Sequence, residues 1–95
     1  MKPYLLKEEE IKELGAKISD WEIHPKYIER NIIFKNFIDA FSFMTKVALL
    51  AEKYNHHPNW ENVYSQVRIK LFTHDLGGIS NLDHVMASEI NKLLK

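Results

Sequence analysis

A long helical pattern of apolar residues between Phe37 and Tyr54 constrains the fold more than any other segment of the chain. A segment of this length predicts a helix on the order of 30 Å long, enough to cross a small sheet. Its apolar side chains recur at helical spacing: Phe37, Ala40, Phe41, Met44, Val47, Ala48, Ala51 and Tyr54.

Both ends of this helix carry termination signals. Asn36 stands where an N-cap is wanted, with Asp39 in the first turn. Asn55 and Pro58 close the other end, because the residue before a proline avoids helical angles. Additional apolar residues widen the stripe beyond one face and predict a second buried surface, against another subunit: Phe43, Leu49 and Leu50.

The segments before the long helix predict a short helix and a β-hairpin. Residues Lys7 to Ile18 have apolar side chains at i, i+3 and i+7, with acidic residues early and a lysine late. Trp21 to Ile23 and Tyr27 to Phe34 are β-prone runs separated by a proline-containing turn. Alternation in the second run is imperfect, so its core face is left unassigned.

After the long helix, residues Val63 to Thr73 alternate in the manner of a half-buried strand, with Val67, Ile69 and Leu71 on one face. A bend or bulge near Ser65 and Gln66 would split this run into two strands. Ser80 and Asp83 then form a capping signature for a C-terminal helix.

This order of elements predicts an α+β fold with the order α-β-β-α-β-β-α. We expect a single domain spanning residues 1–95, with an antiparallel sheet of three to four strands and helices packed on one face. A chain of this size buries a smaller fraction of its surface than larger domains do, and oligomerisation can add to the buried area.

Composition narrows the possible functions. Acidic and basic residues balance at 13 each, so the whole chain has no long-range field to attract nucleic acid or an anionic membrane. There is no cysteine, which excludes disulfides and thiol catalysis and fits a reducing compartment. No apolar run approaches a membrane span, and the N-terminus lacks a signal-peptide core. We therefore expect a cytoplasmic protein without direct nucleic-acid or membrane partners.

Three histidines flank the predicted strand region and suggest acid/base chemistry. His56 and His57 leave the long helix just before Pro58, and His74 follows the strand beside Asp75. Histidine is the side chain whose unperturbed pKa lies nearest neutrality. Glu52, on the last helical turn, can reach the loop that follows.

Less specific interpretations stay open for each of these residues. A histidine in a small domain is often solvated, and capping alone explains Ser80 and Asp83. Three histidines and a carboxylate could also form a zinc site. Against a metal, His56 and His57 are adjacent and lack the i, i+4 spacing that places two imidazoles on one helix face.

Several segments resemble the pterin-4a-carbinolamine dehydratases. The resemblance covers roughly residues 21 to 94, and the pairing of the EKxxHHPxW and THD motifs is its most specific part. The matching segments are Glu52 to Trp60, Asn62 to Tyr64, Leu71 to Asp75, then Gly78, Ser80 and Asp83, with Phe34 to Phe37 and Ala40 to Ala48 before them.

The resemblance implies dehydration of a 4a-hydroxytetrahydropterin to the quinonoid dihydropterin, in tetrahydrobiopterin recycling. It implies no metal and no cofactor, and assembly as a homodimer or homotetramer. It assigns catalysis to four residues and substrate contact to seven: His56, His57, His74 and Glu52 are catalytic; His56, His57, Pro58, Thr73, His74, Asp75 and Asp83 bind substrate. Animal members of the family also bind a homeodomain transcription factor, so an adaptor or coactivator role is the alternative.

Overall fold

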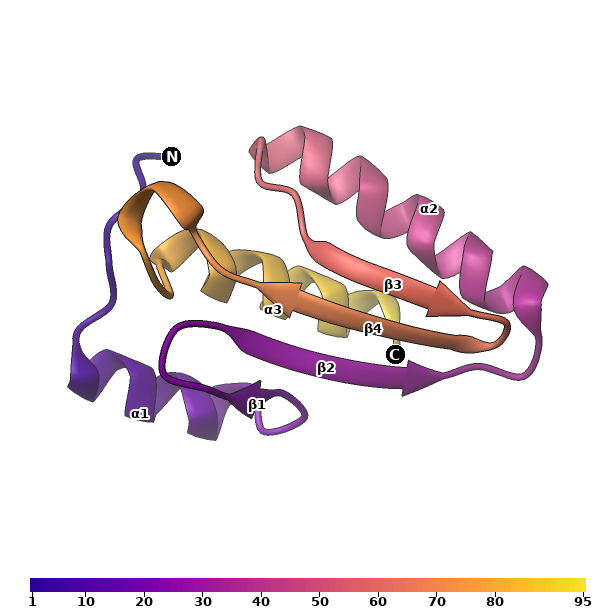
Figure 1. Cartoon of the computed structure of the whole chain (residues 1–95), viewed down its shortest axis with the longest axis horizontal. Coiled ribbons are helices and arrows are strands. Elements are labelled where there is room, and N and C mark those ends of the chain that lie inside the picture. Colours follow the sequence, from indigo (N-terminus) through magenta and orange to yellow (C-terminus); the bar gives the residue numbers. More distant parts are fainter.

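The computed structural model describes residues 1–95 and has the predicted order of helices and strands (Figure 1). A short 3-10 turn is the only element beyond that order. The elements are α1 Glu8–Lys17, β1 Glu22–Ile23, β2 Ile28–Ile33, α2 Phe37–Tyr54, β3 Asn59–Val63, β4 Gln66–Leu71, the 3-10 turn His74–Leu76 and α3 Asn81–Leu93.

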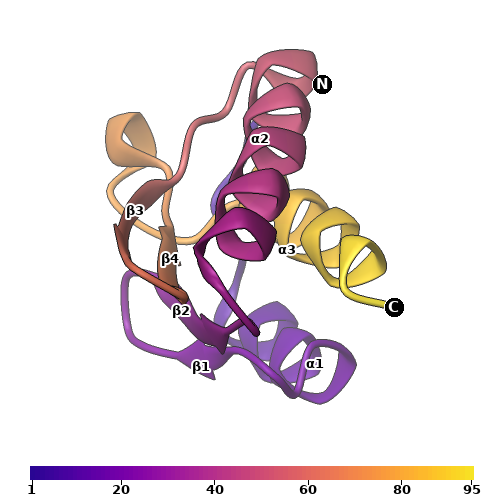
Figure 2. The same cartoon turned by 90° about the vertical axis from the view of Figure 1, so that its right-hand side faces the viewer.

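One antiparallel sheet, in the order β1-β2-β4-β3, carries all three helices on the same face (Figure 2). This two-layer arrangement confirms the predicted fold class. The core lies between the layers, because strand residues such as Ile28, Val67 and Ile69 are fully buried against Val47 of α2 and Ile90 of α3. The other face of the sheet is open to solvent.

The run from Val63 to Thr73 is split into two strands near Ser65, as the sequence allowed, and the break is a tight turn. The chain reverses at Tyr64 and Ser65, and Tyr64 takes a left-handed conformation with φ 52°. β3 therefore begins at Asn59, earlier than the predicted strand. Val63 belongs to β3 and is 69% exposed, whereas Val67 in β4 is buried as predicted.

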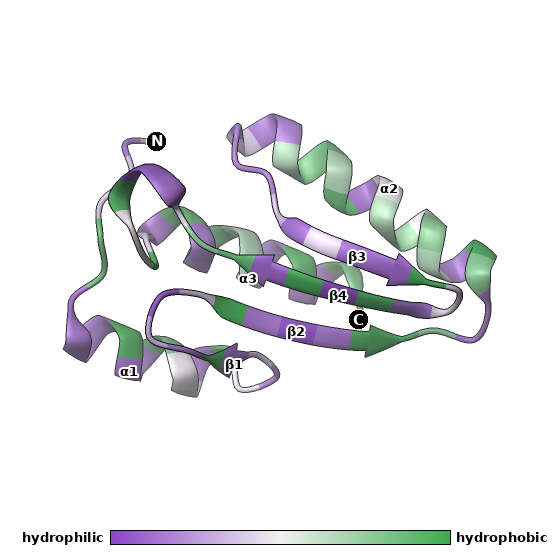
Figure 3. Ribbon diagram, in the orientation of Figure 1, coloured by the Kyte–Doolittle hydropathy of each residue, from purple (hydrophilic) through white to green (hydrophobic).

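The boundaries and N-cap of α2 agree with the prediction. The Asn36 side chain accepts a hydrogen bond from the Asp39 backbone N–H at 2.8 Å. The buried stripe is displaced from the predicted one, because Phe43 is buried while Phe37 and Phe41 are 45% and 54% exposed. Apolar residues consequently cover α2 on its outer side as well (Figure 3).

The imperfect alternation of β2 has a structural explanation. Ile28 and Arg30 both point toward the helices, and the Arg30 guanidinium donates to Asn91 Oδ1 of α3 at 2.6 Å. Trp21 Nε1 donates to the same oxygen at 2.8 Å. A charged residue on the core face is thus satisfied by a polar partner from α3.

The N-terminal arm, residues 1–7, is fixed to the start of α3. Leu6 N–H donates to the Ile79 carbonyl at 2.9 Å, and Leu5 forms an isolated β-bridge with Ser80. None of the three helices is both long enough and apolar enough to cross a membrane.

Candidate active site

The β3–β4 hairpin brings the two histidine segments together. Asn59 at the start of β3 pairs with Lys70 near the end of β4. Residues 55–58 precede β3 and residues 72–75 follow β4, so both segments lie at the same end of the sheet (Figure 1). A single long strand would have separated them.

The end of α2 directs the two adjacent histidines differently. Asn55 adopts a left-handed conformation with φ 50°, a common way for a helix to end. His56 N–H still donates to the Ala51 carbonyl at 3.0 Å, and its side chain turns into the protein. His56 is only 8% exposed, whereas the His57 side chain is 57% exposed.

A closed network of buried polar groups holds His56. Its Nε2 donates to Asp83 Oδ1 at 2.5 Å, and Asp83 itself is fully buried. Asp83 Oδ2 also accepts from the Thr73 hydroxyl at 3.0 Å and from Ser80 N–H at 2.8 Å. Thr73 and Ser80 oxygens lie 2.5 Å apart. Every buried side-chain nitrogen and oxygen in the protein has a partner, so His56 has one fixed orientation.

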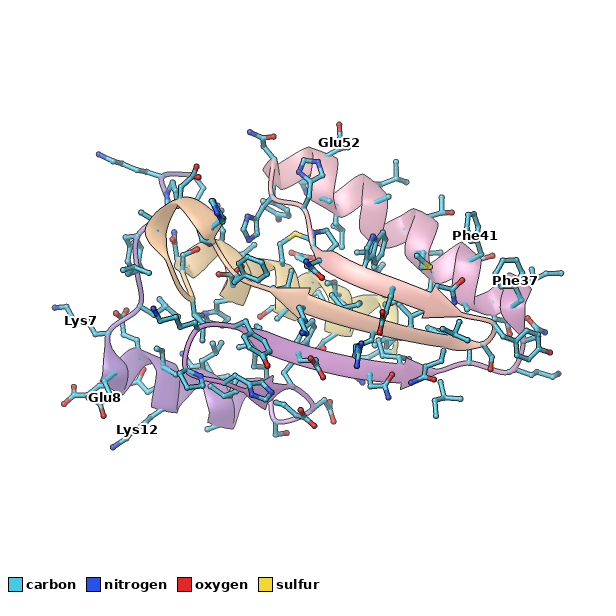
Figure 4. All side chains as sticks on the ribbon, in the orientation of Figure 1. Lys7, Glu8, Lys12, Phe37, Phe41 and Glu52 are labelled. Atoms are coloured by element: carbon cyan, nitrogen blue, oxygen red, sulfur yellow. The ribbon has the colours of Figure 1, made fainter.

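The other two histidines are accessible. His57 Nε2 donates to Glu52 Oε2 at 2.6 Å, and Glu52 projects from the last turn of α2 (Figure 4). The His74 ring lies 3.5 Å from the Asp75 carboxylate, and both side chains are more than 90% exposed at 91% and 97%. These imidazoles are thus available to a bound molecule.

Two hollows open on either side of His56 and share part of their walls. The first has a volume of about 470 Å³ and contains all three imidazoles. The second, of about 540 Å³, has His56 but not His57 or His74 in its wall. Four residues border both hollows: Asn55, His56, Thr73 and Asp75.

Most of the predicted site residues line the first hollow, and two do not. Pro58 and Asp75 lie in its wall with the three histidines. Asp83 lies behind His56 without reaching the hollow, and Glu52 acts on its rim through His57. No group of three or more histidine, cysteine or acidic side chains is placed to hold a metal ion.

Sequence reasoning missed several wall residues. Asn59 and Phe72 complete the first hollow, and neither was a predicted site residue. Asn55, recognised only as a helix stop, lies between the two hollows. Its position before His-His-Pro was the one available signal, because a left-handed C-cap places the next residues beside the helix end.

Comparisons with known proteins identify the family. The family model described as pterin 4 alpha carbinolamine dehydratase matches residues 4–93. A protein of Prochlorococcus marinus subsp. pastoris assigned as a pterin-4-alpha-carbinolamine dehydratase is 66% identical over 95 residues, which cover 100% of this chain and 99% of the relative. The chain belongs to the pterin-4a-carbinolamine dehydratase family.

Two solved structures of dehydratase-like proteins have a fold similar to that of this chain. The crystal structure of a transcriptional coactivator/pterin dehydratase from Brucella melitensis has a TM-score of 0.91 and 38% identity, with 95% of this chain and 98% of that chain covered. A pterin dehydratase-like protein described as a RuBisCO assembly factor in the alpha-carboxysome shares the fold alone, with a TM-score of 0.63 and 22% identity over 77% of this chain and 84% of that one.

Members of the dehydratase family are hydro-lyases, and the family assignment gives this chain the same enzyme class. Such a reaction needs groups that deliver a proton to a leaving hydroxyl and remove one from its neighbour. Three imidazoles around one hollow, two of them accessible, provide such groups.

Proposed function

We propose that this dehydratase removes water from a 4a-hydroxytetrahydropterin to give the quinonoid dihydropterin, using its histidines as general acid and base. The observation that carries the proposal is the convergence of His56, His57 and His74 on one hollow of about 470 Å³. The family assignment supports a pterin substrate, and the three histidines that line the hollow support acid/base chemistry.

The reaction balances with proton transfers alone. A protonated imidazole gives its proton to the hydroxyl on C4a, the C4a–O bond breaks, and water leaves. A neutral imidazole takes the N5 proton, and the freed electron pair forms the C4a=N5 double bond. Positioned general acids and bases of this kind each contribute roughly 10²- to 10⁴-fold to a rate.

His57 and His74 are the main acid/base pair in this proposal. Both are exposed to the hollow, so their protons can exchange with substrate and solvent. His56 is oriented by Asp83 and assists, with a preference for the other stereoisomer at C4a. Glu52 tunes and orients His57 through their 2.6 Å hydrogen bond.

Pro58, Thr73 and Asp75 are the proposed substrate contacts beside the histidines. The Thr73 hydroxyl is engaged by Asp83 and Ser80, which leaves its methyl group for the substrate. Asp75 is exposed and offers a carboxylate to the N–H groups of a pterin ring. Asp83 is fully buried, so we assign it a positioning role through His56 in place of direct contact.

The place of this reaction in tetrahydrobiopterin recycling, its cytoplasmic location and its independence of metal and cofactor belong to the same proposal. The recycling role and the independence of metal and cofactor are what the resemblance to the dehydratase family implies, and the location is the expectation from the sequence.

The first experiment follows carbinolamine loss by ultraviolet absorbance, with 4a-hydroxytetrahydropterin generated in situ. We expect the protein to accelerate dehydration over the spontaneous rate. His57→Ala and His74→Ala should each lower turnover by about 10² or more while the fold stays intact, as circular dichroism would verify. Wild-type rates in both variants would remove this mechanism.

We also propose that the chain forms a homodimer or homotetramer through the outer face of α2. Large apolar side chains are exposed there, and the tilted rings of Phe37 and Phe41 lie 5.7 Å apart between centroids (Figure 4). Ile38 and Leu49 extend this surface at 73% and 68% exposure. Burying an unpaired charge in an apolar contact costs free energy. Phe41→Glu should therefore shift the sedimentation mass to that of a smaller species.

The Brucella melitensis relative is described as a transcriptional coactivator as well as a dehydratase. The same apolar surface could bind a partner helix here. A wild-type protein that is monomeric alone and gains mass only with a partner would favour this adaptor role over self-association.

A further inference from the structure

The second hollow beside His56 is not used by the acid/base chemistry. It extends from the shared residues Asn55 and Thr73 toward the N-terminal arm, and its volume is about 540 Å³. Away from the shared wall its lining is mainly apolar. The six residues found only in this hollow are Met1, Pro3, Lys53, Tyr54, Leu76 and Leu82.

The arm that forms one wall is tied down by Asn81. The Asn81 side chain accepts from Tyr4 N–H at 2.8 Å and donates to the Lys2 carbonyl at 3.2 Å. Asn81 N–H also donates to the Tyr4 carbonyl at 3.2 Å. These bonds fix residues 2–4 against α3 and so give the hollow a defined wall.

Pterin chemistry links the two hollows. The reacting atoms C4a and N5 must lie near the three imidazoles, and C6 is bonded directly to N5. Any substituent on C6 therefore leaves the ring beside the histidines. A ring in the first hollow directs that substituent either to solvent or past Asn55 and Thr73 into the second hollow.

We propose that the second hollow is the subsite for the C6 substituent of the substrate, and that the N-terminal arm sets its size. This inference rests on the proposed dehydration. The substituent would enter the second hollow past the polar side chains of Asn55 and Asp75, which line both hollows. Its far end would contact the apolar side chains of Pro3, Leu76 and Leu82. The walls thus fit a short chain that is hydroxylated near the ring and apolar at its tip.

Filling the hollow tests the assignment. The probes are the 4a-hydroxy forms of 6-methyltetrahydropterin and of a tetrahydropterin with a 6-(1,2-dihydroxypropyl) group. Pro3→Trp and Leu76→Trp should each lower kcat/KM for the dihydroxypropyl substrate by about tenfold or more, because a filled pocket rejects the larger group. The methyl substrate should keep its wild-type kcat/KM. Lys12→Trp on the exposed side of α1, remote from the hollow, is the matched control (Figure 4).

Releasing the arm is the complementary test. Asn81→Ala removes both side-chain bonds to the arm. It should raise KM for the dihydroxypropyl substrate, while kcat for the methyl substrate stays unchanged. General destabilisation of the protein would not affect one substrate and spare the other.

The outcomes separate this inference from the proposed function. If the wild-type protein dehydrates neither substrate, the proposed function fails and this subsite fails with it. If it dehydrates both, and Pro3→Trp changes the two kcat/KM values equally or not at all, the subsite assignment alone is overturned. Leu76 shares a 3-10 turn with His74, whereas Pro3 lies on the exposed arm. If Leu76→Trp slows the reaction of both substrates, the result for Pro3→Trp is therefore the one that tests the subsite.

Discussion

Replacing Asp83 with asparagine tests whether this residue supports catalysis as well as capping a helix. The carboxylate accepts three hydrogen bonds, from His56, Thr73 and the Ser80 backbone, and is fully buried. Asparagine keeps the shape and one oxygen, but it removes the charge and places an NH₂ group against donors. The His56 imidazole would therefore lose the charged acceptor that fixes its orientation.

The expected magnitude follows from the burial of this bond. A hydrogen bond to a charged group contributes about 1.5–3 kcal/mol. If that energy is what holds His56 in its productive orientation, its loss lowers kcat/KM by roughly 10- to 150-fold, since each 1.36 kcal/mol is tenfold in rate. A similar energy lost from stability would lower Tm by roughly 6–24 °C in a domain of this size.

The assay is the rate of carbinolamine dehydration per folded molecule, with urea unfolding measured on the same samples. Asn36→Ala is the matched control, because it also removes a hydrogen bond that caps a helix N-terminus but lies at the far end of α2. It should cost about 1 kcal/mol of stability with an unchanged rate. An Asp83→Asn protein that turns over within about twofold of wild type, a loss of less than about 0.4 kcal/mol, would show that Asp83 is only a cap.

Three further outcomes are expected. Glu52→Gln should lower kcat/KM by less than about tenfold and leave stability unchanged, because exposed ion pairs contribute about 0–1 kcal/mol; a loss as large as that of Asp83→Asn would contradict this ranking. Ile69→Ala should cost about 2–5 kcal/mol of unfolding free energy and Ile69→Val about 0.5–1.5, measured by urea titration, since Ile69 is fully buried; equal costs would argue against a packed site. Incubation with EDTA should leave the dehydration rate unchanged, and a loss restored by zinc would support the metal interpretation that the sequence left open.

Local features of the fold were predictable from the sequence because they depend on residues within one helical turn. Asn36 and Ser80 are N-caps as predicted, and α2 runs from Phe37 to Tyr54 as its periodicity indicates. The predicted face of α2 was less accurate. Phe37 and Phe41 fit the helical spacing equally well, and only packing against the sheet selects Phe43 for the core.

The candidate site was likewise predictable from the sequence only in part. The motifs around His56, His57 and His74 were sufficient to indicate the family and its acid/base chemistry. Capping explained Asp83 and the resemblance assigned it to substrate contact, yet its carboxylate binds His56, which is 27 residues away. A capping residue and a catalytic support have the same local pattern, so the sequence could not tell them apart.

The sequence by itself therefore determined the elements, the family and the residues that could carry chemistry. The tertiary structure decided which of them meet. The reversal at Tyr64 and Ser65 brings His57 and His74 to one end of the sheet. The contact between Tyr4 and Asn81, 77 residues apart, holds the N-terminal arm that forms one wall of the second hollow. Caps and periodicity are fixed by neighbours along the chain, whereas these meetings depend on strand register and on packing between distant segments.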